Sequence, residues 1–311
     1  MTGSSVSLPR LLVSSVVRGS QQGDSHGGLY LIDFARGEFE QVIDWNTSGI
    51  DWEGRGADRG LRGIVIAGKE IFVAASDELF VYDPWFRQIA SYTCPHLKHC
   101  HEMSLHGSKL YITSTGFDAI VRFDIATRRF DLGIAIVTDG RLVNARAFDP
   151  NQPGAHPPSN VLHINNVHVD DTGVYVSGRK MPALVQLTQT SIGMVAGLPR
   201  GTHNARPFRG GVLYNDTDSD SVVWQGLQGR VAIRTPLYDP KTLTHMDVDQ
   251  SGLARQGFGR GLCVISETLI AAGSSPTTVS IHDLEARASI RTINLSNDVR
   301  NAAHGLAVWP F

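Results

Sequence analysis

Short apolar runs recur along the chain and are separated by polar turns. Each run spans only a few residues and is bounded by Gly, Asp, Asn or Ser, as at residues 71–74, 110–113 and 174–177. No long stretch repeats its apolar residues with the period of about 3.6 that a helix requires. Short β-rich segments between turn residues indicate strands, so the pattern predicts an all-β protein.

Several segments of the chain share one spacing. In each, a leading residue is followed nine residues later by the first residue of a second apolar strand. The five leading residues are Arg62, His101, Asn165, His203 and Arg260, and the second strands begin at Ile71, Leu110, Val174, Val212 and Leu269. A sixth copy begins at His304. A fixed spacing of this kind indicates one structural unit repeated in space.

Each unit continues with two further strands. The third strand often ends in Asp, as at residues 79–83, 120–124 and 279–283, and the fourth is more polar. Four strands repeated radially form the blades of a β-propeller. The predicted inner strands, one for each blade, span residues 62–67, 101–106, 165–170, 203–208, 260–265 and 304–309.

The two ends of the chain complement each other. Residues 11–17, 28–34 and 38–45 form only three strands, whereas the segment at His304 is an inner strand without a blade of its own. Pairing the two ends would complete a blade and remove two open strand edges. The chain therefore resembles the six-bladed β-propeller superfamily, and residues 1–311 are predicted to form a single propeller domain.

The composition excludes several classes of protein. Hydrophobic residues make up 41% of the chain, which is enough to bury a large core. Lys and Arg total 28 and Asp and Glu 30, so the balanced charge argues against a nucleic-acid partner. No apolar run reaches the roughly 18 residues of a transmembrane helix, and residues 1–7 lack the features of a secretory signal. The three cysteines lack zinc-ribbon spacing. These features predict a cytoplasmic globular protein with no membrane partner.

The leading positions carry the candidate chemistry, because the first strand of each propeller blade lines the central channel. In order around the predicted ring they read His304, Arg62, His101, Asn165, His203 and Arg260. Histidine thus falls on alternate blades. Three neutral imidazoles with open coordination positions are typical of a catalytic metal site. We therefore predict that these three histidines bind a divalent transition metal (Fe, Zn, Mn or Cu), with Asn165 as a weaker ligand or as the holder of a metal-bound water.

This ring resembles the axial metal sites of two families of propeller enzyme. Oligogalacturonate lyases use three His and an amide side chain, and carotenoid oxygenases use four His around iron. Both families have seven blades, one more than is predicted here. The resemblance implies a metal-dependent enzyme with its site on the propeller axis.

Arg62 and Arg260 would make the predicted site positive. Two guanidiniums beside a metal ion favour a small anionic substrate that carries a carboxylate or phosphate. The alternative is a structural one, in which these arginines pair with channel acids such as Glu102 and the histidines bridge neighbouring blades. Glu102 itself is expected either to orient a histidine ring or to make a contact between blades.

Residues near the same rim extend the candidate site. His163 lies two residues before Asn165 and is a candidate general base. Arg179 and Asn215 follow second strands and are candidate substrate-binding residues. The segments 46–61, 138–161 and 237–259, which lead into inner strands, are long enough to act as binding loops.

These observations predict an enzyme that acts on a small anion by redox-neutral lyase, isomerase or hydrolase chemistry. If the metal is iron or copper, the same site favours an oxygenase. A propeller that binds a ligand or partner without catalysis is the alternative from another class.

Overall fold

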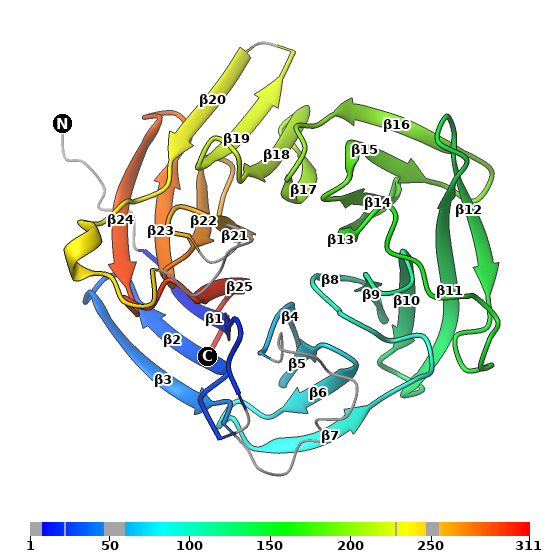
Figure 1. Ribbon diagram of the computed structural model, residues 1–311, viewed down its shortest axis with the longest axis horizontal. Coiled ribbons are helices and arrows are strands. Elements are labelled where there is room, and N and C mark those ends of the chain that lie inside the picture. Colours follow the sequence, from blue (N-terminus) through cyan, green and yellow to red (C-terminus); the bar gives the residue numbers. More distant parts are fainter. Residues whose placement is uncertain (1–7, 22, 47–59, 228, 247–254) are drawn as a thin grey trace.

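Six antiparallel sheets surround a central channel in the computed structural model, which describes residues 8–21, 23–46, 60–227, 229–246 and 255–311 (Figure 1). The described part contains no helix beyond a single 3-10 turn at Pro240–Thr242. The prediction of an all-β, six-bladed propeller is confirmed.

The inner strand of each blade lies beside the channel and the outer strands follow it radially (Figure 1). The first blade consists of β25 (Asn301–Val308), β1 (Arg10–Val17), β2 (Gly27–Asp33) and β3 (Glu38–Asp44). The second consists of β4 (Ile64–Ala67), β5 (Glu70–Ala75), β6 (Glu78–Tyr82) and β7 (Gln88–Tyr92). The third consists of β8 (Met103–His106), β9 (Lys109–Ser114), β10 (Ala119–Asp124), β11 (Arg129–Thr138) and β12 (Val143–Phe148).

The remaining three blades each have four strands. The fourth consists of β13 (Ile164–Asp170), β14 (Gly173–Gly178), β15 (Met181–Leu187) and β16 (Ile192–Gly197). The fifth consists of β17 (His203–Phe208), β18 (Gly211–Asp216), β19 (Ser221–Gly226) and β20 (Gly229–Arg234). The sixth consists of β21 (Gly259–Val264), β22 (Leu269–Ser274), β23 (Thr278–Asp283) and β24 (Ala288–Asn294).

The ring closes through the pairing of β25 with β1. These strands are antiparallel, and Leu12 lies opposite Ala307. The side chain of Ser14 reinforces the pairing, because its Oγ accepts a hydrogen bond of 2.8 Å from the Gly305 amide. The predicted closure of the propeller by its two ends is therefore confirmed.

One expectation of the sequence analysis needs correction. Residues 138–161 were expected to form a loop at the channel mouth, but they begin with the β11–β12 hairpin, and β12 lies on the outer edge of the third blade (Figure 1). The Asp139 carboxylate accepts hydrogen bonds of 2.8 Å from the amides of Arg141 and Leu142, which stabilises the hairpin turn. The third blade thus has five strands rather than four.

The hydrophobic core lies between neighbouring blades. Phe72 and Val81 of the second blade pack with Leu110 and Phe123 of the third in one cluster. Because both faces of each blade are covered, the middle strands are continuous apolar runs, and the six residues of β22 are all buried. The outermost strands have solvent on one side, which explains the polar fourth strand that the sequence repeats.

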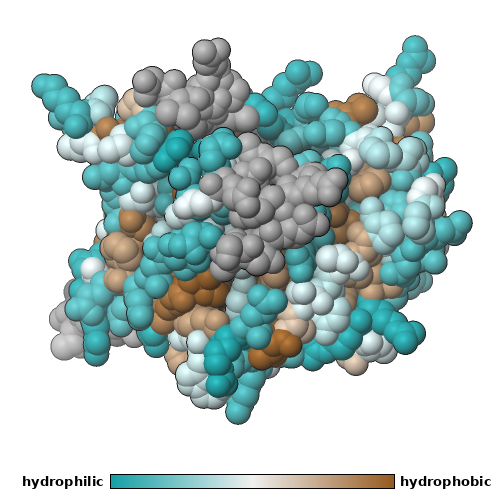
Figure 2. Space-filling model, turned by 60° about the horizontal axis from the view of Figure 1, so that its bottom comes forward, coloured by the Kyte–Doolittle hydropathy of each residue, from teal (hydrophilic) through white to brown (hydrophobic). Residues whose placement is uncertain are grey.

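The outer surface differs from these interfaces. Hydrophilic residues dominate the face in Figure 2, and hydrophobic patches are scattered among them. In the described residues, no helix is long and apolar enough to cross a membrane.

His282 on β23 makes the stability of the fold dependent on pH. Its side chain is buried, and burial lowers its pKa from 6.5 to about 4. The unfolded chain therefore binds the extra proton first as the pH falls. We expect the free energy of unfolding to drop by about 2 kcal/mol between about pH 7 and about pH 5 from this residue alone. Denaturant titrations across this range should show a shallower pH dependence for His282→Gln, and parallel curves for the two proteins would contradict the assignment.

Candidate functional site

The six leading residues, Arg62, His101, Asn165, His203, Arg260 and His304, lie together at one end of the channel wall, which we call the mouth. Each occupies the start of its inner strand, or the two residues before it, except His304, which is four residues into β25. All six side chains are buried, with at most 6% of their surface exposed. The ring expected from the nine-residue spacing is therefore present as a set of buried polar side chains.

Guanidinium groups contact two of the three histidines. Arg260 Nη1 donates a hydrogen bond of 2.8 Å to His304 Nε2. Arg62 Nη1 lies 3.3 Å from His101 Nε2 and 3.4 Å from its Nδ1. The rings of His101 and His304 have their centroids 5.9 Å apart. Charged donors and imidazole acceptors therefore alternate across this side of the mouth.

His203 stands beside an aromatic residue that gathers further positive charge. The ring centroids of His203 and Phe258 are 5.5 Å apart, and Arg260 Cζ lies 4.8 Å from the Phe258 centroid. Arg18 and Arg255 contact the same ring at 5.2 and 5.6 Å. Cations over an aromatic face are attracted by its quadrupole. Phe258 thus collects three guanidiniums next to His203.

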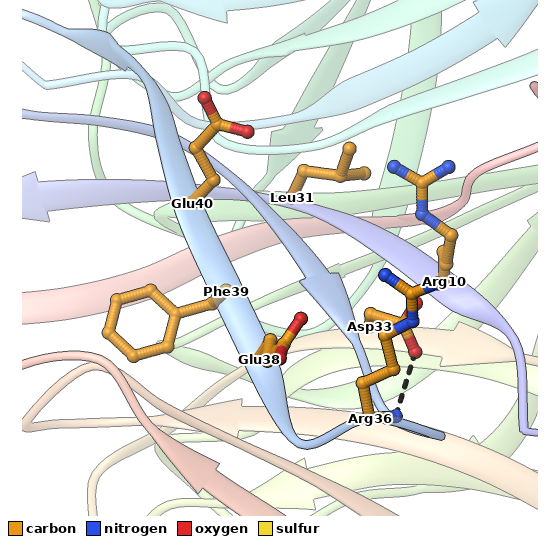
Figure 3. Close-up of a pocket in the computed structure, with 7 residues that line it drawn as sticks. All are labelled: Arg10, Leu31, Asp33, Arg36, Glu38, Phe39 and Glu40. Carbon is orange, nitrogen blue, oxygen red and sulfur yellow. Dashed lines mark hydrogen bonds and ion pairs between the residues drawn. The ribbon is translucent and has the colours of Figure 1, made fainter.

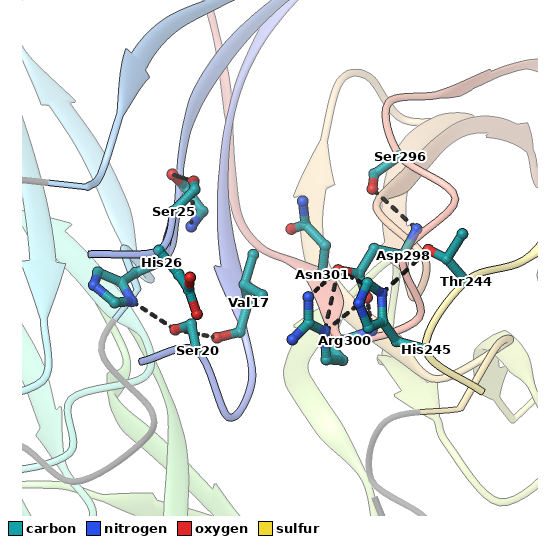
Figure 4. A network of polar contacts seen from close by, with 12 residues as sticks. Val17, Ser20, Ser25, His26, Thr244, His245, Ser296, Asp298, Arg300 and Asn301 are labelled. Carbon is teal, nitrogen blue, oxygen red and sulfur yellow. Dashed lines mark hydrogen bonds and ion pairs between the residues drawn. The ribbon is translucent and has the colours of Figure 1, made fainter. Parts of the chain in front are cut away.

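Arg18 was not found from the sequence, because it lies in the β1–β2 turn and outside the repeated spacing. Backbone and side-chain bonds hold this turn. The Arg18 amide donates to the Arg300 carbonyl at 3.0 Å, and Ser20 Oγ lies 2.8 Å from the Val17 carbonyl and 2.6 Å from His26 Nδ1. Figure 4 shows the Ser20–His26 contact and the neighbouring Arg300–Asp298 ion pair, which closes at 2.7 Å.

Backbone carbonyls determine which nitrogen of two imidazoles carries the proton. His101 Nδ1 lies 2.7 Å from the His99 carbonyl, and His203 Nδ1 lies 2.8 Å from the Gly201 carbonyl. Since a carbonyl only accepts, Nδ1 is the protonated nitrogen in both rings and Nε2 carries a lone pair. In the described part of the chain, His203 Nε2 is buried and has no hydrogen-bond partner.

The histidines of the ring are neutral at neutral pH. Burial lowers the pKa of His101, His203 and His304 well below the usual 6.5. The positive charge of Arg260 lowers all three pKa values further, and that of Arg62 lowers those of His101 and His304. All three rings therefore act as acceptors; His304 Nε2 already accepts from Arg260 and His101 Nε2 lies against Arg62, whereas His203 Nε2 has no partner among the described residues.

Asn165 lies on the fourth blade, between the blades that carry His101 and His203, and its side-chain amide makes no hydrogen bond to the described residues. Only 1% of its surface is exposed, and neither Oδ1 nor Nδ2 has a hydrogen-bond partner within the described ranges. A buried polar group left without a partner costs about 1–3 kcal/mol. The amide therefore keeps an unused donor and an unused acceptor inside the ring of leading residues.

The arrangement agrees with a metal site in one respect and differs from it in another. Metal-bound histidines commonly donate their second nitrogen to a backbone carbonyl, as His101 and His203 do here. Among the residues that the structure describes, however, no three His, Cys, Asp or Glu side chains are gathered to hold a metal ion. The lone pair of His304 Nε2 is directed at Arg260.

The remaining predicted site residues differ in how close they come to the ring. His163 is half-buried, and its ring centroid lies 5.6 Å from that of His101. Burial first, and then the charges of Arg260, Arg179 and Lys180, lower the pKa of His163 to about 4. His163 and Arg179 thus belong to the electrostatic surroundings of the mouth.

Asn215 and Glu102 take part in contacts between blades. Asn215 Nδ2 donates to Asn204 Oδ1 at 3.0 Å and to the Gly261 carbonyl at 3.1 Å. Asn204 Nδ2 in turn donates to Glu102 Oε1 at 2.6 Å. Of the two roles considered for Glu102, the structure therefore supports the contact between blades.

Two of the three expected binding loops lie partly outside the described residues. Residues 47–59 of the segment 46–61 and residues 247–254 of the segment 237–259 lie outside the described residues. A separate hollow on the edge of the first blade is lined by charged side chains, including Arg10, Asp33 and Arg36 (Figure 3). The Arg36 amide donates to Asp33 Oδ1 at 3.0 Å. This hollow contains none of the leading residues.

Comparisons with known proteins support the fold. No protein-family model and no curated protein matches the chain. A solved nidogen/laminin complex contains a chain that is 11% identical, with a TM-score of 0.58, covering 96% of this chain and 97% of that one. A putative 6-phosphogluconolactonase from Bacteroides fragilis is 9% identical, with a TM-score of 0.55, covering 98% and 99% of the two chains. At such identities the likeness establishes the propeller architecture alone.

The adjacent residues Asn165 and Asn166 test whether the side-chain amide of Asn165 lacks a hydrogen-bond partner. Replacing Asn165 with Leu, which has a similar branched shape, should raise the free energy of unfolding by about 1 kcal/mol or more, because an unpartnered buried amide is removed. Asn166→Leu is the matched control, since Asn166 Nδ2 donates to the Ala205 carbonyl, and this change should be destabilising. Chemical denaturation of both variants measures the difference. Equal destabilisation by the two changes would show that the Asn165 amide is already satisfied.

Proposed function

We propose that the channel mouth binds a small anion bearing a carboxylate or phosphate and that the protein acts on it by redox-neutral lyase, isomerase or hydrolase chemistry. The observation that carries this proposal is the contact of Arg62 and Arg260 with neutral imidazoles, in the same ring of leading residues as the unpartnered amide of Asn165. Guanidiniums in a buried setting hold carboxylates and phosphates through charge-assisted hydrogen bonds. The neutral imidazoles add acceptors without adding charge.

The side chains of the mouth divide into binding and proton-transfer roles in this proposal. Arg260 and Arg62 hold the anionic group of the substrate. His203 Nε2, with its lone pair and no partner among the described residues, accepts a proton from a carbon or oxygen next to that group. The Asn165 amide donates a hydrogen bond to the oxygen on which negative charge develops.

The bound anion, His163 and Arg179 support proton transfer in this scheme. A bound anion next to His203 favours the protonated ring, so binding of the substrate raises the basicity of the proton acceptor. His163 is the second candidate proton acceptor, since its ring lies against that of His101 at the same mouth. Arg179 contributes positive charge to this side, as its effect on His163 indicates.

Proton exchange provides a direct test. A panel of small 2-oxo and 2-hydroxy carboxylates in D₂O, followed by NMR, reports loss of the C3 protons of the 2-oxo acids or of the C2 proton of the 2-hydroxy acids. We expect exchange with at least one member. His203→Gln should slow it by about 100-fold or more, the usual contribution of a general base. Arg260→Gln should raise the half-saturating concentration by about tenfold or more, because a charge-assisted contact is lost.

The controls separate binding from catalysis. Arg287→Gln, an exposed arginine in the β23–β24 turn, should change neither quantity. Arg260→Lys should recover part of the binding. If carboxylates bind with unchanged affinity in Arg260→Gln, or if His203→Gln leaves the exchange rate unchanged, the proposed roles are wrong. Binding without exchange across the panel would favour the non-catalytic alternative, a propeller that only holds its ligand.

A metal-dependent form of the same site is the second candidate function. The protonated Nδ1 atoms of His101 and His203, which lie beside backbone carbonyls, favour it because this tautomer leaves a lone pair on each Nε2. Metal binding would require the hydrogen bond between Arg260 Nη1 and His304 Nε2 to break. A divalent metal held by His101, His203 and His304, with Asn165 as a fourth ligand, would polarise the bound carboxylate or its neighbouring carbonyl.

Elemental analysis tests the metal. Protein purified without added metal should contain close to one equivalent of Fe, Zn, Mn or Cu, and His101→Ala should lose most of it while it keeps its fold. Occupancy should also fall in acid, since imidazole binds metal only when neutral. Iron or copper would favour the oxygenase over the redox-neutral reaction. Substoichiometric metal that is unchanged in His101→Ala would remove the metal-dependent form and leave the metal-free site.

A further inference from the structure

A cavity of about 530 Å³ lies in the channel beyond the leading ring. All six inner strands line it, and every lining residue follows the leading residue of its strand in the sequence. Because the inner strands are arranged alike around the axis, this cavity lies further along the channel than the histidines. Its size is within the range of about 300–1,000 Å³ that is usual for small-molecule sites. We call it the lower chamber.

The lower chamber has its own ring in the repeated spacing. The residues three positions after a leading residue include Val65, Ser104, His168, Arg206 and Cys263, and all five line the chamber. The polar members come from four consecutive blades, the third to the sixth. Leu262 and Leu306 line the chamber beside them. The lower chamber therefore combines an apolar wall with a polar one.

Arg206 is the charged group of this second ring. It lies on β17, and its electrostatic interactions with Glu102, Asp170 and Cys263 place its guanidinium among groups of three other inner strands. In the described residues its side chain forms no hydrogen bond and no ion pair, and its Nε atom is buried without a partner. A guanidinium has five N–H donors and remains charged in proteins.

Two acids lie near Arg206, Glu102 in the chamber wall and Asp170 outside it, and one carboxylate oxygen of each is hydrogen-bonded to another group. Glu102 Oε1 accepts the hydrogen bond from Asn204 Nδ2. Asp170 Oδ1 accepts from the amide and hydroxyl of Thr172, and its Oδ2 lies 3.7 Å from His168 Nε2. Arg206 is partly buried; a cation that is withdrawn from water without a bonded counter-ion is costly, and an anion supplied from outside relieves that cost.

We propose that the lower chamber binds an organic monocarboxylate with an apolar body. The carboxylate accepts hydrogen bonds from Arg206, and the apolar body packs against Val167, Leu262 and Leu306. The site is separate from the mouth, because none of its lining residues belongs to the leading ring. It adds a second ligand to the one proposed for the mouth and does not depend on it.

Calorimetry with hexanoate and hexanamide tests the proposal on the full chain. We expect hexanoate to bind at least about tenfold more tightly than hexanamide, which has the same body but no charge, because a charge-assisted contact is lost. Arg206→Gln should weaken hexanoate binding by about tenfold or more, and Arg206→Lys should weaken it less. Arg209→Gln is the matched control, because Arg209 lies just beyond the same strand and contacts Trp224 and Glu285 outside the chamber.

Two further measurements complete the test. Arg260→Gln should leave hexanoate binding within about threefold, since a larger loss would assign the carboxylate to the mouth and overturn the proposal. On the unmodified protein, hexanoate should slow maleimide labelling of Cys263, which lines the chamber, but not that of Cys94, which does not. Equal binding of hexanoate and hexanamide, no binding of hexanoate at about 10 mM, or unchanged labelling of Cys263 would each overturn it.

Discussion

The serine side chain at position 14 holds the two ends of the chain to the start of the second blade. Its hydroxyl donates to the Arg62 carbonyl and accepts from the Gly305 amide, so one buried group joins β1, β25 and the segment that leads into β4. Gly305 is required at this junction, since a Cβ there would lie 2.3 Å from the Arg62 carbonyl. Closure of the ring therefore sets the separation of Arg62 and His304, and the contacts of the mouth depend on it.

Charge at the mouth is organised by pairing guanidiniums with imidazoles. Arg260 bonds to His304 and Arg62 lies against His101, so each arginine adds to the effect of burial in keeping its neighbouring ring neutral. Burial lowers the pKa of each ring far below 6.5, and repulsion between an imidazolium and the neighbouring guanidinium lowers it further. The same pairing opposes a metal, because the lone pairs that would bind it are already directed at cations. An anion meets no such competition.

The amino-acid sequence predicted the features that follow from repetition. The nine-residue spacing is the length of an inner strand, its turn and the start of the next strand, so it places equivalent side chains at one level of the channel. That reasoning located His101, His203 and His304 together with their arginine neighbours. It did not locate Arg18, whose turn lies outside the repeat, or the role of Phe258 in gathering guanidiniums. It also treated the β11–β12 hairpin as a loop, because most of β12 is exposed and it has no counterpart in the other blades.

The spacing that predicted one ring also accounts for a second, and the two differ in chemistry for a physical reason. At the leading level the side chains are His, Arg and Asn, so polar groups contact polar groups across the axis. Two and three residues further, the apolar Val65, Leu262 and Leu306 line the same cavity as Arg206, which has no bonded acid among the described residues. A small polar anion is better matched to the mouth, where donors surround it. An anion with a hydrocarbon body is better matched to the lower chamber, because only there can its apolar part leave water while its charge meets a guanidinium.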